Sequence, residues 1–266
     1  MFKIKNIINR IKNEYKKKKK STLIIYLILR ILIIVSMISQ LILKNYYNSF
    51  LCIFTLLLFT LPDFLKDKFK ISLPSVLEII IYIFIYAAEI LGEINHFYEI
   101  IPFWDIILHT INGFVCAGIG FSLFNILSNE NRNLILSPFY TAIVAFCFSM
   151  SVGAVWELFE YGCDKYLNYD MQKDEIITTV ASVKLNNELS QVPYTMNDIK
   201  KTEIYYDDTS FIINGGYLDI GINDTMEDLF VNFIGALFFS TGGYFYLKHQ
   251  FNNDFVKNFI PKREIE

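Results

Sequence analysis

The chain has 266 residues, of which 53% are hydrophobic, and it holds 25 Phe and 17 Tyr. This composition is too apolar for a soluble domain of the same length, so it predicts a polytopic membrane protein. The net charge is only −3, and the basic run Lys16 to Lys20 has no interleaved aromatic residues, so nucleic acid is not an expected partner.

Six stretches are predicted to cross the bilayer, because a span needs about 20 mostly apolar residues. They are Thr22 to Leu43, Ser49 to Leu61, Leu73 to Leu91, Phe103 to Leu127, Leu134 to Tyr161 and Asp228 to Leu247. The second is short unless Tyr46 and Tyr47 anchor it at the interface. The predicted fold class is an all-α polytopic membrane protein with six transmembrane helices and a small β-rich extracytoplasmic insertion.

The predicted organisation has five parts. They are a basic amphipathic cytoplasmic N-terminus (1–21), transmembrane helices 1–5 (22–161), an extracytoplasmic β-rich loop domain (162–223), transmembrane helix 6 (224–247) and a cytoplasmic tail (248–266). In the loop, Ile176 to Leu185 and Glu203 to Ile213 are rich in Ile, Val, Thr and Tyr, and Asn214-Gly215-Gly216 follows as a turn. We expect a small antiparallel sheet that caps the helix bundle.

Orientation follows from the basic residues, which gather before the first span, in the second connection and in the tail. Short loops rich in Lys and Arg stay in the cytoplasm, so both termini are predicted to lie inside. The outer ends of spans three and five and the outer starts of spans four and six then meet at one face.

Ionisable residues lie at helical spacing at these outer ends, although a charge near the bilayer core costs roughly 2.5 to 3.5 kcal/mol. They are Glu89, Glu93 and His96; Asp105 and His109; Glu157, Glu160 and Asp164; and Asp224 and Asp228. Each set falls on one helix face, and small residues such as Gly113, Gly153 and Gly235 continue these faces inward, where they allow close helix packing. We therefore expect one shared acidic pocket, which needs a divalent cation or bound protons as counter-charge.

Three explanations of the pocket compete. In the first, the polar side chains only hydrogen-bond between helices, which suits Asn232. In the second, the pocket binds a divalent metal ion whose bound water is the nucleophile, with Asp105, His109, Glu157, Glu160, Asp224 and Asp228 as candidate ligands. Glu157 and His109 are then the candidate catalytic residues, supported by the polar cluster Glu89, Glu93, His96, Asp164 and Asn232. In the third, the acids bind or conduct cations, protons or an amine ligand.

The motifs Trp104-Asp105-Ile106-Ile107-Leu108-His109, Trp156-Glu157-Leu158-Phe159-Glu160 and Asp224-Thr225-Met226-Glu227-Asp228, with Asn232 and Gly235, resemble the YjdF-like bacterial inner-membrane proteins. More distantly, Asp105 with His109 and Asp228 with Asn232 are similar to VanZ-like proteins, although Glu160 stands where those chains usually offer Gln. The resemblance implies a multi-pass protein of the bacterial cytoplasmic membrane without a settled activity. The VanZ-like link to glycopeptide tolerance implies an envelope lipid or peptidoglycan precursor as partner, besides the lipid bilayer.

Overall fold

The computed structural model describes residues 19–69, 71–130, 137–186, 191–248 and 262–263. The predicted amphipathic segment within 1–21 therefore lies almost wholly outside the described residues. The chain divides into two compact units. The first holds Met1–Gly153 and Val231–Glu266, and the second holds Ala154–Phe230.

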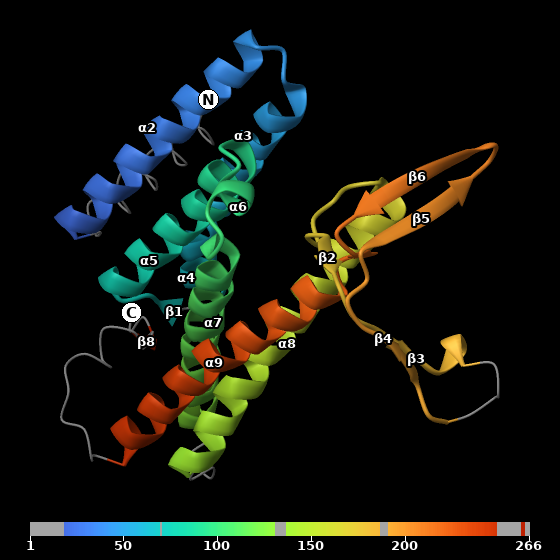
Figure 1. Cartoon of the computed structure of the whole chain (residues 1–266). Coiled ribbons are helices and arrows are strands. Elements are labelled where there is room, and N and C mark those ends of the chain that lie inside the picture. Colours follow the sequence, from blue (N-terminus) through green and yellow to red (C-terminus); the bar gives the residue numbers. More distant parts are fainter. Residues whose placement is uncertain (1–18, 70, 131–136, 187–190, 249–261, 264–266) are drawn as a thin grey trace. The chain divides into compact units, whose positions relative to one another are not determined.

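Six helical segments in the described residues are long and apolar enough to cross a membrane, which confirms the predicted fold class (Figure 1). They are α2 (Lys20–Ile42), α3 (Tyr46–Leu58) with α4 (Leu61–Phe69), α5 (Ser75–Tyr86) with the π-helix η1 (Ala87–Ile94), α7 (Trp104–Glu130), α8 (Pro138–Leu167) and α9 (Ile222–Leu247). The short helix α6 (Phe97–Ile100) lies between η1 and α7.

Several helices are longer than the apolar runs that predicted them. The second span is Tyr46–Lys68, because α4 follows α3 closely and the Asn45 side chain caps the start of α3. Helix α8 continues past Tyr161 to Leu167, and α9 begins at Ile222, ahead of Asp228. Hydrophobicity marks only the part of a helix that lies in lipid, so polar helix ends escape such a prediction.

In the first unit, α2 packs against α3 and α5 around three buried aromatic rings. The ring centroids of Tyr26 and Phe59 both lie 5.1 Å from that of Tyr82. The Tyr82 hydroxyl donates to Glu78 at 3.0 Å, and the Arg30 guanidinium donates to the Tyr26 hydroxyl. Aromatic packing thus holds the first three spans together, whereas each of these two polar contacts lies within a single helix.

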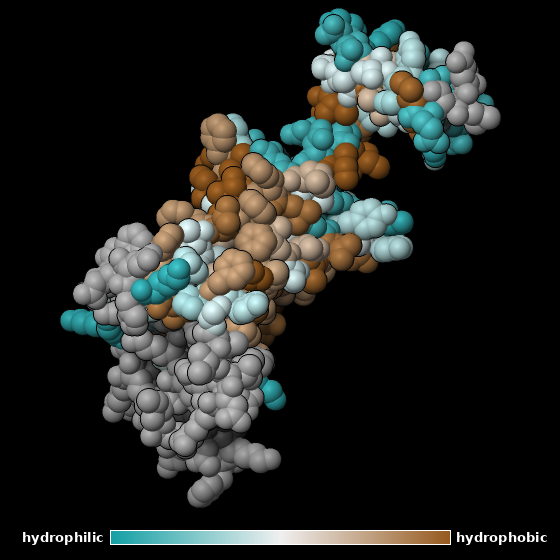
Figure 2. Space-filling view, turned by 90° about the horizontal axis from the view of Figure 1, so that it is seen from below, coloured by the Kyte–Doolittle hydropathy of each residue, from teal (hydrophilic) through white to brown (hydrophobic). Residues whose placement is uncertain are grey.

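Many large apolar side chains stay exposed, which a soluble protein would avoid. On α2 they include Ile31, Val35 and Ile42, and on α3 they include Phe50 and Leu57. Figure 2 shows hydrophobic side chains over much of the face that it draws. These exposed faces are suited to contact with lipid tails.

The C-terminal tail returns to the connection between α4 and α5. Strand β1 (Ile71–Ser72) pairs antiparallel with β8 (Lys262–Arg263). Four candidate spans separate the two strands in sequence, and an even number of crossings brings a chain back to the same side. The pairing therefore agrees with the predicted topology, whereas the assignment of that side to the cytoplasm stays a prediction.

The second unit is β-rich, as predicted, but its strands form separate pairs and not one sheet. They are β2 (Glu175–Ile177) with β7 (Tyr217–Asp219), β3 (Val180–Ser182) with β4 (Tyr194–Met196), and β5 (Lys201–Tyr206) with β6 (Thr209–Asn214), all antiparallel. A short 3₁₀ helix, η2 (Val183–Leu185), follows β3. Gly215, at φ +93°, and Gly216 turn the chain from β6 into β7, which pairs with β2. A Cβ on Gly216 would lie 2.3 Å from the Ile177 carbonyl oxygen of β2.

Candidate functional site

Three buried carboxylates gather within the second unit. Glu157 and Glu160 belong to α8, and Asp228 belongs to α9. Each offers an oxygen atom, and these atoms all lie within 4.8 Å of one another. The three-residue spacing on α8 puts both glutamates on one helix face. Buried carboxylates this close repel one another unless protons or a cation neutralise them.

Trp156 holds one of these carboxylates in place. Its indole Nε1–H donates to Oε1 of Glu160 at 2.8 Å, and its ring packs against that of Phe159 with centroids 5.5 Å apart. This bond fixes the rotation of the Glu160 carboxyl group. The sequence analysis named Trp156 only as part of a motif and gave it no role, although its position four residues before Glu160 is the spacing that such a bond requires.

The ends of α8 and α9 in this unit are tied to the loop between α8 and β2. Asp164 accepts backbone N–H bonds from Met171 at 2.7 Å and Gln172 at 2.9 Å. Asp224 accepts the backbone N–H of Lys173 at 2.8 Å. Both aspartates therefore help to fold the loop. Within the described residues, the structure does not bring the predicted ligand Asp224 into the group of three carboxylates.

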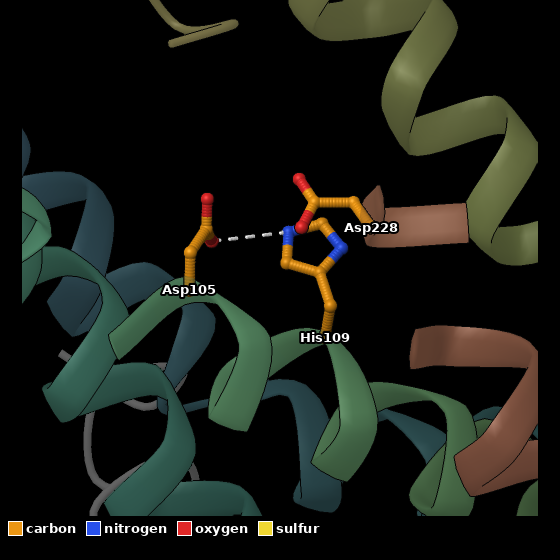
Figure 3. A group of neighbouring side chains, drawn as sticks. All are labelled: Asp105, His109 and Asp228. Atoms are coloured by element: carbon orange, nitrogen blue, oxygen red, sulfur yellow. Dashed lines mark ion pairs between the residues drawn. The ribbon is translucent and has the colours of Figure 1, made fainter. Parts of the chain in front are cut away.

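In the first unit, the side chains of Asp105 and His109 contact each other along the first turns of α7 (Figure 3). His109 Nε2 lies 3.4 Å from Asp105 Oδ1, as the four-residue spacing predicts. His109 is buried and Asp105 is partly buried. The position of Asp105 in the first turn also suits a carboxylate, because a helix N-terminus attracts negative charge. The pair holds the imidazole in one orientation.

Glu89 and Glu93, two predicted supporting residues, lie on the π-helix η1 in the first unit. The wider winding of a π-helix changes the hydrogen-bond pattern of its carbonyl groups. The indole Nε1–H of Trp104 donates to the Ala87 carbonyl at 3.3 Å, which ties the start of α7 to η1. Single π-helical turns recur at functional sites. The supporting role of Glu89 and Glu93 stays a prediction.

His96 departs from the helix face predicted for it. Regular helical spacing would align it with Glu89 and Glu93, but helix η1 ends at Ile94 and His96 takes a left-handed conformation at φ 58°. Its side chain is 63% exposed and lies 3.5 Å from Glu99. The π-helix followed by a left-handed residue therefore removes His96 from the predicted stripe.

A layer of small and amide residues joins α7, α8 and α9 within the first unit. The Ser149 hydroxyl donates to the Gly113 carbonyl at 2.7 Å, and the Asn112 amide donates to Asn232 Oδ1 at 3.3 Å. A Cβ on Gly113 would lie 2.2 Å from the Asn232 carbonyl oxygen, and one on Gly153 would lie 2.8 Å from the Asn232 side-chain nitrogen. The prediction that small residues let these helices approach closely is thus confirmed.

A family described as "Predicted membrane protein (DUF2238)" matches residues 22–249 of this chain. The chain belongs to this family. The DUF2238 match begins in α2 and ends after α9, so it includes every clustered residue described above. The finer resemblance to YjdF-like proteins stays a prediction.

An uncharacterized protein of Thermotoga maritima is 30% identical to this DUF2238 chain over 103 residues. The match covers 38% of the chain and 52% of the relative, so the chain spans about half the length of the curated relative that it matches. No solved structure matches the chain.

Proposed function

We propose that this membrane protein binds a divalent cation through Glu157, Glu160 and Asp228. The observation that carries the proposal is the group of three buried carboxylates whose oxygen atoms lie within 4.8 Å of one another. Three carboxylates buried at that distance must be neutralised, and a divalent cation that they bind together would neutralise them.

The donor set indicates the class of metal. Carboxylate oxygens suit hard cations such as Mg²⁺, Mn²⁺ and Ca²⁺, whereas an imidazole in the set shifts the preference toward Mn²⁺, Fe²⁺ or Zn²⁺. Asp105 and His109 are the further ligands that the sequence predicts for the same centre. The Asp105 carboxylate orients the imidazole, as carboxylates do for many metal-binding histidines.

The chemistry that such a centre offers is the activation of water or the polarisation of an ester or phosphoryl oxygen. Glu157 is the proposed base and His109 the second proposed catalytic group. The substrate class that we propose, an envelope lipid or a peptidoglycan precursor, rests on the resemblance to VanZ-like proteins and on the membrane location.

Transport of cations or protons is the alternative, and it requires polar groups through the whole membrane. Beyond the layer that contains Asn232, α7, α8 and α9 pack through an apolar cluster in the first unit. Its buried members are Ala117, Phe121, Ala145, Ala236 and Phe239. The cluster contains no ionisable side chain, which disfavours a path for protons or cations between these helices in the first unit.

Metal analysis of protein purified without chelators tests the proposal. We expect about one divalent cation per wild-type chain, and its loss from Glu160→Gln and Asp228→Asn. Asp174→Asn, which removes an exposed acid outside the group, is the matched control and should keep the metal. Loss of metal from His109→Ala would indicate that the His109 imidazole is a further metal ligand. Equal, negligible metal in wild type and all variants would disprove the metal centre.

A further inference from the structure

The hairpin β5–β6 leaves apolar side chains exposed on both of its faces. Cross-strand register puts Ile204, Tyr206 and Phe211 on one face, and Tyr205 and Ile212 on the other. All five side chains are exposed, and among the described residues β6 pairs with β5 and with no further strand. A two-stranded hairpin is only marginally stable by itself in water, so pairing with a further strand, or packing against another protein surface, would stabilise this one.

The two outer edges of the hairpin differ in their protection against pairing. Strand β5 carries Lys201 and Glu203, charges of the kind that discourage contact between strand edges. Strand β6, with the sequence Thr-Ser-Phe-Ile-Ile-Asn, has no charge, no Pro and no Gly. Apolar, uncharged strands of this type favour pairing with another strand.

The backbone of β6 is oriented for such pairing. The N–H of Gly215 donates to the Lys200 carbonyl, so these two residues form a hydrogen-bonded pair of the antiparallel ladder. Hydrogen-bonded pairs recur at every second residue, so Thr209, Phe211 and Ile213 direct their backbone groups toward β5. The intervening residues Ser210, Ile212 and Asn214 therefore direct their backbone N–H and C=O groups to the outer edge of the hairpin.

We propose that β6 pairs antiparallel with β6 of a second copy of this chain, about a two-fold axis at Ile212. This register uses all three outward-facing residues, with Ile212 opposite its own copy and Ser210 opposite Asn214 of the second copy. It also places Phe211 beside Ile213 of the second copy. No charged side chains of β6 meet, because the strand has none, and the result is a four-stranded sheet. The two-fold arrangement closes on itself, as most homodimers do.

A cysteine at the axis tests the register directly. Directly opposite residues in a hydrogen-bonded pair have Cα atoms about 5.5 Å apart, which a disulfide spans. Ile212→Cys should therefore form a covalent dimer in membranes under a mild oxidant. Ile204→Cys on β5 is the matched control, because Ile204 is 46% exposed and Ile212 is 47% exposed, and it keeps the same native cysteines. No cross-link at Ile212, or equal yields in both variants, would overturn the proposal.

A charged residue at the two-fold axis tests the interface without a cross-linking reaction. Ile212→Lys sets two lysines opposite each other in the dimer, whereas in the monomer the new lysine faces Glu203 across the hairpin. We expect a dimeric wild type in detergent and a dimer dissociation constant raised at least about tenfold by Ile212→Lys, with little change for Ile204→Lys. Unchanged helical circular dichroism checks the fold of both variants. A monomeric wild type, or dimers of equal strength in both variants, would contradict the two-fold pairing.

Discussion

At the scale of single residues, the hydrogen bond from Trp156 to Glu160 is the contact that most directly orients a proposed ligand. The bond is 2.8 Å long and joins a half-exposed indole to a buried carboxylate. Groups that hold a metal ligand in place often change metal affinity 10- to 100-fold when they are removed. Trp156 is therefore expected to act as a positioning residue.

Trp156→Phe should weaken metal affinity by about 10-fold to 100-fold, because the ring remains and only the N–H donor is lost. Isothermal titration of chelator-treated protein with Mn²⁺ measures the effect. Tyr161→Phe, a change on an exposed position of the same helix, should leave the affinity unchanged. If wild type binds the metal and Trp156→Phe binds it equally well, the positioning role is wrong while the centre itself stands.

Asp174, which lies outside the membrane-spanning helices, should make the stability of the fold depend on pH. The protein around this exposed carboxyl group reduces its hydration and so raises its pKa above the ordinary value, and the carboxylates of Asp170, Asp164 and Asp219 add to the rise. The folded state then binds this proton more tightly than the unfolded state, so the contribution of Asp174 to stability falls as pH rises from the ordinary carboxyl pKa through the raised one.

Asp174→Asn should remove that fall and leave the protein slightly more stable at neutral pH, by about 0.5 kcal/mol or less as for other surface substitutions. Thermal unfolding midpoints of both proteins, measured with a chelator from acidic to neutral pH, check this. A variant that lost stability relative to wild type as pH rose would show the opposite sign.

At the scale of elements, the close approach of α7 and α9 depends on glycine. Gly113→Ala would place a methyl group about 2.2 Å from a backbone carbonyl oxygen of α9, so the two helices must separate. We expect a loss of about 1–3 kcal/mol, typical of an overpacked interior. Gly242→Ala on α9 is the matched control, because a Cβ there meets nothing within 4 Å. Its expected effect is neutral or slightly stabilising.

Thermal unfolding in detergent compares the two alanine variants. Equal midpoints for Gly113→Ala and Gly242→Ala would mean that α7 and α9 do not pack as described.

The helix interiors were predictable from sequence, whereas their irregular ends were not. Gly113, Gly153 and Asn232 each lie four residues from a predicted site residue on the same helix. The faces by which these three helices pack could therefore be inferred directly. The π-helix before His96 could not be predicted, because the pattern of apolar residues does not show where a helix winds more widely. The turn at Asp207 inside the predicted second β segment was missed for a similar reason, since it has no Gly or Pro to mark it.

At the scale of the whole molecule, six spans and an inserted β-rich unit follow from composition and from the long gap between the fifth and sixth apolar runs. Of the predicted ligands, Glu157, Glu160 and Asp228 come together, whereas Asp224 bonds to a loop backbone. Spacing assigns residues to a helix face, but it does not show which carboxylates a nearby loop will use as hydrogen-bond acceptors.

The topology can be tested by cysteine labelling in intact cells. Single cysteines at Lys66 and Lys248 should resist a membrane-impermeant reagent, because both positions lie on the predicted cytoplasmic side. A cysteine at Asp207, on the exposed turn of the β5–β6 hairpin, should react. Labelling of Lys66→Cys together with protection of Asp207→Cys would mean that the chain has the opposite orientation in the membrane.

Anomalous scattering from Mn²⁺-loaded crystals tests most directly whether the three buried carboxylates hold a cation. We predict an anomalous peak bounded by Glu157, Glu160 and Asp228, about 2.0–2.3 Å from their oxygen atoms. A further contact from His109 would extend the centre as the sequence predicts. Crystals with no peak at these three residues, or with manganese bound only elsewhere, would contradict the proposed metal centre.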